Sequence, residues 1–280
     1  MKDKTVVITG ATSGIGEVAA SRLAQKGARI VFVARGPSRG EATLKHLNAV
    51  APDLKHAVHY GDFSTLAEMK RVAGEIAGAE PKIDVLINNA GAMFSPRQVT
   101  ADGLEMTFAV NHMAYFVVSN ILLPNIEASG NGRIVATASD AHRAAKLDFD
   151  DLQSERNYIA LGVYGRSKLM NILFTRELAR RLNGKPVTAN CLHPGFVATR
   201  FGDNNGALTR SVFGFAKNFA LSPEQGAQTI IYLASSPDVQ GKSGGYYAKS
   251  KPATPTRAAQ SDADAKRLWD VSAEIAGLGA

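Results

Sequence analysis

A tyrosine and a lysine lie four residues apart in the segment Y-G-R-S-K, at Tyr164 and Lys168. If this segment is helical, the spacing places both side chains on one face, one turn apart. A free tyrosine titrates near pH ~10, so it carries protons poorly at neutral pH. A neighbouring ammonium group favours the phenolate and brings the tyrosine pKa closer to neutrality. The pair is therefore a candidate acid and base, although the same spacing alone occurs on many solvated helices.

A glycine-rich turn near the N-terminus is a candidate nucleotide site. Residues 9–16 read T-G-A-T-S-G-I-G, between an apolar run and a helical segment. Glycines let the backbone turn tightly and approach a pyrophosphate, which then binds free N–H groups at the helix N-terminus. The spacing departs from the common fingerprint G-x-G-x-x-G, and an ordinary glycine loop is the alternative. The position after the first strand favours a nucleotide, whose expected contacts are Gly10, Ser13, Gly14, Ile15 and Gly16.

The end of the second apolar run indicates which dinucleotide is used. An acidic side chain there would bind the adenine ribose hydroxyls and repel a 2′-phosphate. The sequence reads V-A-R-G at 33–36 and places Arg35 there instead of an acid. Because a guanidinium can pair with the phosphate and stack on the adenine, Arg35 predicts NADP(H) rather than NAD(H). The alternative is that Arg35 is an ordinary surface residue and that the selectivity is weak.

Short β-branched apolar runs alternate with amphipathic helical segments along the chain. Their hydrophobicity is continuous, as in V-V-I and D-V-L-I, which is typical of strands covered on both faces. This alternation predicts an α/β fold: a single domain over residues 1–280 with a doubly wound, mainly parallel sheet of seven strands and helices on both faces. The expected strands are Thr5–Thr9, Arg29–Ala34, Ala57–Tyr60, Val85–Asn88, Arg133–Ser139, Val187–Leu192 and, with the weakest pattern, Gly245–Ala248.

Two segments interrupt the alternation of strands and helices. Residues 140–161 form a polar excursion, and residues 200–221 form another that carries Phe213, Phe215 and Phe219. Both follow the carboxyl ends of expected strands, where open α/β sheets bind ligands. We expect them to be walls of an active site, with 200–221 as a mobile lid over the substrate. The alternative is that the phenylalanines close the core or a subunit interface.

Composition and charge place the chain among globular proteins. Of the 280 residues, 45% are hydrophobic and 20% are charged, which suits a large core. The net charge is +7 and the sequence pI is about 9.5. The basic residues are nevertheless scattered among acidic ones, and no basic run interleaves with aromatic residues. We therefore expect no nucleic-acid partner, and instead a solvated surface with a few residues for an anionic cofactor.

The chain also suggests where the protein is located. The first expected strand begins almost at the initiator methionine, which leaves no room for a signal peptide or an N-terminal anchor. The longest uncharged stretch, residues 106–126, is long enough to span a bilayer, but it contains Pro124 and three asparagines. A buried core or interface helix is the better interpretation. We expect a cytoplasmic protein without stable membrane insertion.

No metal site is expected. The separations of His112, His142 and His193 match no compact set of metal ligands. These histidines are expected to have their ring nitrogens satisfied within the fold.

With these features in place, the chain resembles the short-chain dehydrogenase/reductase family over nearly its whole length, which implies a Rossmann fold. Within the family it is most similar to the retinol-dehydrogenase-like branch, through S-D-A-H (139–142), D-F-D-D-L-Q-S-E (148–155) and the segment 167–182. The family motifs in this sequence are T-G-x-x-x-G-I-G at 9–16, Asp62, N-N-A-G at 88–91, Asn111, Ser139, Y-x-x-x-K at 164–168 and P-G at 194–195.

The resemblance implies a role for each motif residue. Tyr164 would protonate the substrate carbonyl oxygen as hydride arrives, while Lys168 would lower the Tyr164 pKa and hydrogen-bond the nicotinamide ribose. Ser139 would hold the substrate oxygen, and Asn111 would hold a water in a proton relay. The other implied cofactor contacts are Asp62 and Phe63 beside the adenine, Asn89, Ala90 and Gly91 at the adenosine ribose, and Pro194, Gly195, Val197 and Thr199 at the nicotinamide and its phosphate.

The activity implied by the resemblance is that of an NADP(H)-dependent alcohol dehydrogenase or carbonyl reductase. Such an oxidoreductase transfers hydride between nicotinamide and a lipophilic aldehyde, ketone or retinoid-like substrate. One alternative is a non-catalytic dinucleotide-binding sensor or scaffold, against which the intact Asn–Ser–Tyr–Lys set argues. Another is an enzyme like the light-dependent protochlorophyllide reductases, which are similar in these motifs. The helices around 106–126 and 164–182 are apolar enough to pair subunits into a homodimer or homotetramer, as in many relatives.

Overall fold

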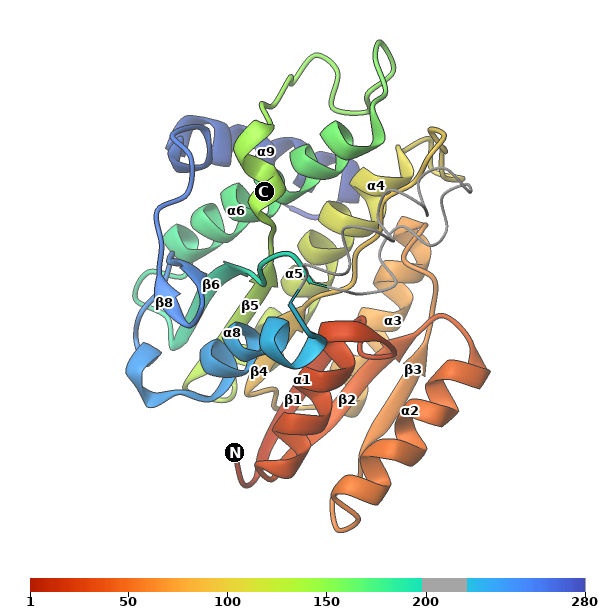
Figure 1. Ribbon diagram of the computed structural model, residues 1–280, viewed down its shortest axis with the longest axis vertical. Coiled ribbons are helices and arrows are strands. Elements are labelled where there is room, and N and C mark those ends of the chain that lie inside the picture. The colour runs from red at the N-terminus through yellow and green to blue at the C-terminus, as the bar shows by residue number, and fades with distance from the viewer. Residues whose placement is uncertain (198–220, 280) are drawn as a thin grey trace.

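The computed structural model describes residues 1–197 and 221–279, and these contain an eight-stranded sheet in the order β3-β2-β1-β4-β5-β6-β7-β8 (Figure 1). All neighbouring strands are parallel except β7 and β8. The predicted α/β fold with a doubly wound, mainly parallel sheet is thus confirmed. The strands are β1 (Lys4–Thr9), β2 (Ala28–Ala34), β3 (Ala57–Tyr60), β4 (Val85–Asn88), β5 (Gly132–Thr137), β6 (Val187–His193), β7 (Tyr246–Ala248) and β8 (Lys251–Pro252).

Helices cover both faces of the sheet (Figure 1). Successive side chains of β1 point to opposite faces, so Val6 and Ile8 join a hydrophobic cluster with α1, α2 and α8, while Val7 joins one with α3, α5, α6 and α9. This two-sided burial explains the continuous hydrophobicity of the strands. The α-helices are α1 (Gly14–Gln25), α2 (Pro37–Val50), α3 (Leu66–Ala79), α4 (Met106–Phe108), α5 (Ala114–Glu127), α6 (Ala160–Arg181), α8 (Pro223–Ser235) and α9 (Asp262–Ala276).

The eighth strand was not predicted. β8 pairs antiparallel with β7 through a tight turn in which Lys249 and Ser250 have φ of 50° and 58°. Two-residue hairpin turns of this kind normally carry Asn-Gly or Asp-Gly, and the Lys-Ser pair lacks this signature. A second difference concerns β5, which ends at Thr137 rather than at the predicted Ser139, because Ser139 caps the following 3₁₀ helix η2 (Asp140–Ala144).

The order of the strands reverses between β1 and β4, which lie side by side at the centre of the sheet. Chain segments leave the carboxyl ends of these two strands in opposite directions, and a crevice forms between them. Open α/β sheets bind their ligands at such a point. The glycine turn after β1 and the N-N-A-G segment after β4 meet there.

The uncharged stretch noted in the sequence forms α4, a π-helical turn η1 (Ala109–Met113) and α5 in one continuous run. By length and composition this helix, Met106–Glu127, could cross a membrane, but 72% of its most hydrophobic window is buried inside the fold. It packs against α3 and the sheet, with Phe116, Val117 and Leu122 fully or almost fully buried. The interpretation as a core helix is therefore supported by its burial.

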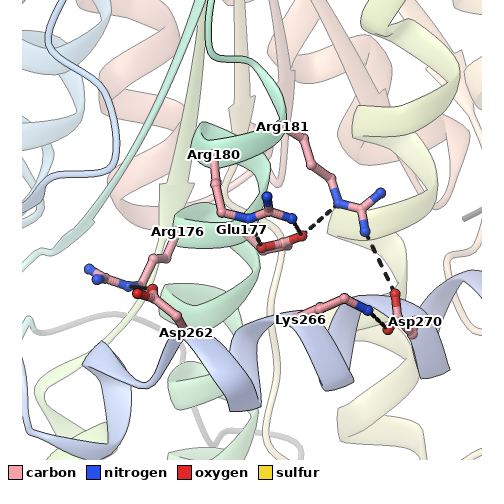
Figure 2. A network of polar contacts seen from close by, with 7 residues as sticks. All are labelled: Arg176, Glu177, Arg180, Arg181, Asp262, Lys266 and Asp270. Carbon is pink, nitrogen blue, oxygen red and sulfur yellow. Dashed lines mark hydrogen bonds and ion pairs between the residues drawn. The ribbon is translucent and has the colours of Figure 1, made fainter.

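Helix α9, near the C-terminus, packs along α6 (Figure 2). The Trp269 ring stacks on Phe174 of α6, with centroids 5.8 Å apart, and meets Phe116 of α5 edge to face at 4.9 Å. Such aromatic packing contributes beyond the buried area alone. Part of the surface that the sequence assigned to subunit pairing is therefore covered by α9 of the same chain.

A network of charges borders this contact (Figure 2). The carboxylate of Glu177, only 2% exposed, accepts hydrogen bonds from Arg180 and Arg181 at 2.6 and 2.7 Å. The Arg181 guanidinium lies 4.4 Å above the Trp269 ring and 3.6 Å from Asp270 of α9. Because Arg181 contacts groups on both helices, it links the C-terminal part of α6 to α9 and helps to hold α6 in place.

Candidate active site

The glycine turn has the geometry of an anion site. Helix α1 begins at Gly14, and its N-cap Ser13 makes no side-chain capping hydrogen bond. The first N–H groups of a helix have no partner within the helix, so they are available to a phosphate. Gly10 and Gly14 have φ of +71° and +59°, which residues with a side chain rarely adopt. These residues fit the pyrophosphate of a dinucleotide.

Gly16 is required by close packing between this turn and the chain after β4. A Cβ atom at Gly16 would lie 2.1 Å from the carbonyl oxygen of Gly10 and 2.4 Å from Nδ2 of Asn89. Asn89 uses that amide to donate hydrogen bonds to the carbonyls of Thr9 and Gly10, at 3.3 and 3.1 Å. The side chain of Asn89, implied as a ribose contact, thus joins β1 to β4 in this structure. The backbone of Ala90 is held in the same way, by the hydroxyl of Thr9.

We expect Gly16→Ala to raise the dissociation constant for NADPH about tenfold or more. The added methyl group must displace the carbonyl of Gly10 or the amide of Asn89, and overpacking of this kind costs about 1–3 kcal/mol. NADPH fluorescence during titration measures the effect. The matched control is Gly74→Ala on α3, where nothing lies within 4 Å of the added Cβ. Equal affinities of the two variants would contradict the close-packing role of Gly16.

The segment after β2 presents basic side chains beside the crevice. Arg35 is exposed where β2 ends, and α2 begins two residues later. Its N-cap is Gly36, which has no side chain that could cap the helix. Arg39, four residues after Arg35, is exposed in the first turn of α2. The sequence reasoning named only Arg35, although Arg39 is a second basic residue in the same short segment between β2 and the first turn of α2.

The residues implied at the adenine differ in what they offer. Asp62 is exposed after β3 and accepts a hydrogen bond from the N–H of Ser64 at 3.0 Å. The ring of Phe63 is 7% exposed and packs in the hydrophobic core. Phe63 therefore presents its backbone rather than its ring to a ligand at this place.

The predicted catalytic residues converge at the carboxyl end of β5. Tyr164 and Lys168 lie on α6, and the hydroxyl of Ser139, just after β5, forms a hydrogen bond with Tyr164. The Lys168 ammonium donates a hydrogen bond to the carbonyl oxygen of Thr137 at 3.0 Å and lies 5.5 Å from the centre of the Tyr164 ring. The structure thus brings together the hydroxyl, phenol and ammonium groups to which the family resemblance gave roles in catalysis.

The protonation of this cluster differs from the expectation. Burial raises the pKa of Tyr164 to about 12, while the hydrogen bond with Ser139 opposes this rise. Burial lowers the pKa of Lys168 to about 7. The expected lowering of the Tyr164 pKa by Lys168 is not found here, because the ammonium lies over the ring and the loss of hydration of the phenol on burial outweighs other influences.

Asn111 lies where the long helix widens into the π turn η1, and such turns often occur at functional sites. Its side chain is fully buried. The amide exchanges hydrogen bonds with the backbone of Ala92 at 2.8 and 2.9 Å and donates to the hydroxyl of Ser167 at 2.9 Å. Both Asn111 and Lys168 lie 3.3 Å from a Cβ built on Gly91, so the three residues are in close proximity. Sequence reasoning missed Ser167, although it stands inside the Y-x-x-x-K segment.

The P-G segment follows β6 beside the glycine turn. Gly195 has φ of +86°, and its N–H donates to Nδ1 of His193 at 3.2 Å. The side chains of Val197 and Ile15 both meet Gly226 of α8, within 2.6 and 2.8 Å of a Cβ built there. These predicted cofactor contacts therefore also join α1 to α8. Thr199 and the predicted lid, residues 200–221, lie outside the described residues apart from Leu221.

The polar excursion 140–161 is anchored to the chain between β4 and α4. The Tyr158 hydroxyl donates to the carbonyl of Phe94 at 2.6 Å, and Gln153 accepts from the N–H of Glu105 at 2.6 Å. Large apolar side chains are exposed where this excursion enters α6: Ile159 is 66% exposed and Leu161 58%. Leu161 precedes Tyr164 by three residues and so shares its helical face. The predicted wall of the site is thus held in place beside Tyr164.

The histidines make hydrogen bonds within the fold. His112 is fully buried, its Nε2 lies 2.8 Å from the Ser272 hydroxyl, and burial lowers its pKa to about 3. The expectation of satisfied ring nitrogens is wrong for its Nδ1, which has no hydrogen-bond partner among the described residues. His142 bonds the carbonyl of Ser139 and accepts from the N–H of Thr256. It therefore ties the Ser139 loop to the chain before α9. No group of three metal-ligating side chains comes together within 1–197 and 221–279.

Comparisons with known proteins agree with this geometry. The profile of the short chain dehydrogenase family matches residues 4–208. Retinol dehydrogenase 14 from Homo sapiens is 40% identical over 297 residues, covering 99% of this chain and 88% of that protein. Retinol dehydrogenase 13 from Homo sapiens is also 40% identical, over 285 residues that cover 99% of this chain and 86% of that protein.

Solved structures have the same fold. An uncharacterized protein from Mycobacterium paratuberculosis superposes with a TM-score of 0.79 at 30% identity, covering 99% of this chain and 94% of that chain. A protein assigned as an NAD(P) dependent gluconate 5-dehydrogenase from Beutenbergia cavernae, solved with bound NADP, has a TM-score of 0.69 at 27% identity. That match covers 89% of this chain and 96% of the other.

Proposed function

The chain belongs to the short chain dehydrogenase family and is an oxidoreductase of the retinol-dehydrogenase-like kind, and we propose that it transfers hydride between NADP(H) and a carbonyl or alcohol group of a lipophilic substrate. The observation that carries the proposal is the cluster of Ser139, Tyr164 and Lys168 beside a glycine turn that fits a pyrophosphate. The bound nicotinamide supplies or accepts the hydride. The protein has to orient the substrate oxygen and move one proton to or from it.

In carbonyl reduction, Tyr164 is the proton donor. Its pKa of about 12 keeps the phenol protonated at neutral pH, so a proton is ready when the carbonyl oxygen gains charge. The Ser139 hydroxyl, which bonds Tyr164, is placed to hold the same oxygen. Asn111 holds the chain just after the N-N-A-G segment through its two hydrogen bonds with Ala92.

The preference for NADP(H) is supported by charge. Arg35 and Arg39 are both exposed at the start of α2, where the adenine ribose of a dinucleotide would lie. The relative from Beutenbergia cavernae was solved with NADP bound. A guanidinium pairs well with a phosphate group, so the pair of arginines favours the phosphorylated cofactor.

A lipophilic substrate is supported by exposed apolar side chains at the start of α6 and just after β6. Ile159, Leu161 and Phe196 are more than half exposed, and Phe196 directly follows the P-G segment. Exposed apolar groups near a site are typical of surfaces that bind apolar ligands. The names of the similar retinol dehydrogenases point to a retinoid-like compound as one candidate.

Oxidation of NADPH with a panel of aliphatic aldehydes, ketones and retinaldehydes tests the proposal. We expect turnover with long-chain or retinoid aldehydes, and less with short polar ones. Tight NADPH binding without turnover of any of these compounds would favour a sensor or scaffold instead. Turnover that requires light and a tetrapyrrole would favour the protochlorophyllide-reductase-like alternative.

We further propose that the protein is cytoplasmic and needs no membrane for its stability. The helix Met106–Glu127 is mostly buried, so we expect recovery in the supernatant after high-speed centrifugation without detergent. The measurement is the distribution of the overexpressed protein between supernatant and membrane pellet before and after a carbonate wash. Retention mainly in the washed pellet would contradict the proposal.

A further inference from the structure

The ammonium group of Lys168 lies between two aromatic rings. Its Nζ is 5.5 Å from the centre of the Tyr164 ring and 5.7 Å from the centre of the Tyr115 ring. Both distances lie within the range of cation–π attraction. Tyr164 belongs to the same helix as Lys168, whereas Tyr115 comes from α5, one turn after Asn111. The two rings thus approach the ammonium from different elements.

The hydroxyl of Tyr115 does not account for its position beside Lys168. It is 1% exposed, and its hydroxyl has no hydrogen-bond partner among the described residues. Because this hydroxyl has no partner, any contribution of Tyr115 to the site comes from its ring rather than from its hydroxyl. Burial raises the pKa of Tyr115 well above its ordinary value, so the group remains a neutral phenol. What a neutral phenol offers to Lys168 is the electron-rich face of its ring.

Few polar groups offset the loss of hydration of the buried Lys168 ammonium. The side chain is 3% exposed, and among the described residues no carboxylate forms an ion pair with it. The groups that contact it are the Thr137 carbonyl from β5 and the two phenols, while Asn111 from η1 approaches the same place at Gly91. Among these groups, only the phenols are titratable. An ammonium removed from water therefore depends on one carbonyl and two aromatic faces.

We propose that Tyr115 is a positioning residue that holds the Lys168 ammonium against Tyr164 and keeps it protonated, which rests on the proposed function of these two residues in proton transfer. The ring of Tyr115 forms the inner side of the ammonium site. Without it, Lys168 would lose its proton at a lower pH and leave Tyr164 without a neighbouring positive charge.

A fluorination series at position 115 tests the proposal. Phenylalanine and its mono-, di- and trifluorinated forms keep the shape of the ring while each fluorine weakens the attraction of its face for a cation. Titration of Lys168 is followed by NMR in the ligand-free protein with Cε-labelled lysine, assigned with Lys168→Met. We expect Tyr115→Phe to titrate nearly as the wild type does, and the midpoint to fall stepwise with fluorine, by about one pH unit at trifluorophenylalanine.

The same substitution at Phe116 is the matched control. Phe116 is the next residue on α5 and equally buried, but its ring packs on Phe174 and Trp269 instead of on Lys168. Trifluorophenylalanine there should leave the midpoint unchanged. In turnover, the fall of the reduction rate at high pH should move with the NMR midpoint across the Tyr115 series.

Three results would overturn the proposal. One is a midpoint that does not respond to fluorine at position 115. Another is a full shift already in Tyr115→Phe, which would assign the effect to the hydroxyl. The third is an equal shift in the Phe116 control. Since the NMR titration needs neither cofactor nor turnover, a failure of the proposed function would show separately, as absence of NADPH oxidation by the wild type.

Discussion

Replacing Tyr164 with phenylalanine should lower the turnover number for carbonyl reduction by about 10²–10⁴-fold and leave NADPH binding nearly unchanged. The substitution removes only the hydroxyl that bonds Ser139 and donates the proton. The ring remains over the Lys168 ammonium, so the site keeps its shape. Steady-state kinetics gives the turnover number, and titration by NADPH fluorescence gives the affinity. A variant that retained more than half of the wild-type rate would disprove the assignment.

Tyr232→Phe is the matched control for this experiment. Tyr232 lies on α8 beside Leu233, whose carbonyl accepts a hydrogen bond from Arg133 at the amino end of β5. Tyr232 therefore lies near the amino ends of the strands, whereas Tyr164 lies near their carboxyl ends. Loss of a tyrosine hydroxyl there should leave turnover unchanged. The comparison separates the chemical role of the Tyr164 hydroxyl from a general effect of losing a phenol.

The same phenol sets the direction of the pH dependence. Tyr164 with a pKa of about 12 is protonated below that pH, as reduction requires, so reduction should not gain rate from this group as pH rises above neutrality. Alcohol oxidation requires the phenolate, whose fraction rises about tenfold per pH unit below the pKa. The oxidation rate of the wild type should therefore increase with pH. An oxidation rate that fell over the same range would contradict the role of Tyr164 as base.

The sequence was sufficient to predict the parallel strands and the helices that connect them. Continuous apolar runs such as Val85–Asn88 predicted buried parallel strands, and the alternation with helices predicted their connection. It was insufficient for β8, because the turn at Lys249 and Ser250 lacks the residues that normally adopt positive φ. It also missed that α9 covers part of α6, since this contact joins residues nearly a hundred positions apart and depends on the fit of Trp269 against Phe174.

The sequence predicted which residues form the candidate site better than it predicted the groups that surround them. The convergence of Ser139, Tyr164 and Lys168 follows from their motif positions, because Ser139 comes just after β5 and the other two lie in the first turns of α6, the helix that follows β5. The location of the ammonium over two rings does not, because Tyr115 reaches it from another helix. The sequence also did not show that the side chain of Asn89 hydrogen-bonds the glycine turn after β1. Motifs specify which groups are present, whereas burial and three-dimensional packing decide their protonation and partners.

Substituting Arg35 with aspartate should shift the cofactor preference from NADPH toward NADH by about tenfold or more. The change removes a partner of the 2′-phosphate and adds a carboxylate that repels the phosphate and accepts from the ribose hydroxyls. A hydrogen bond to a charged group contributes about 1.5–3 kcal/mol, which corresponds to this factor. The measurement is the ratio of kcat/KM for the two cofactors. An unchanged ratio would refute the role of Arg35.

Arg39 determines how complete that shift is. It is exposed in the first turn of α2, four residues after Arg35, and its positive charge would continue to attract the phosphate in the single variant. We therefore expect Arg35→Asp combined with Arg39→Ala to shift the ratio further than either change alone. Arg22→Asp is the control, because Arg22 is an exposed arginine in the last turn of α1, away from the start of α2. If that control shifted the ratio as much as Arg35→Asp, the net charge of the protein rather than a phosphate contact would set the preference.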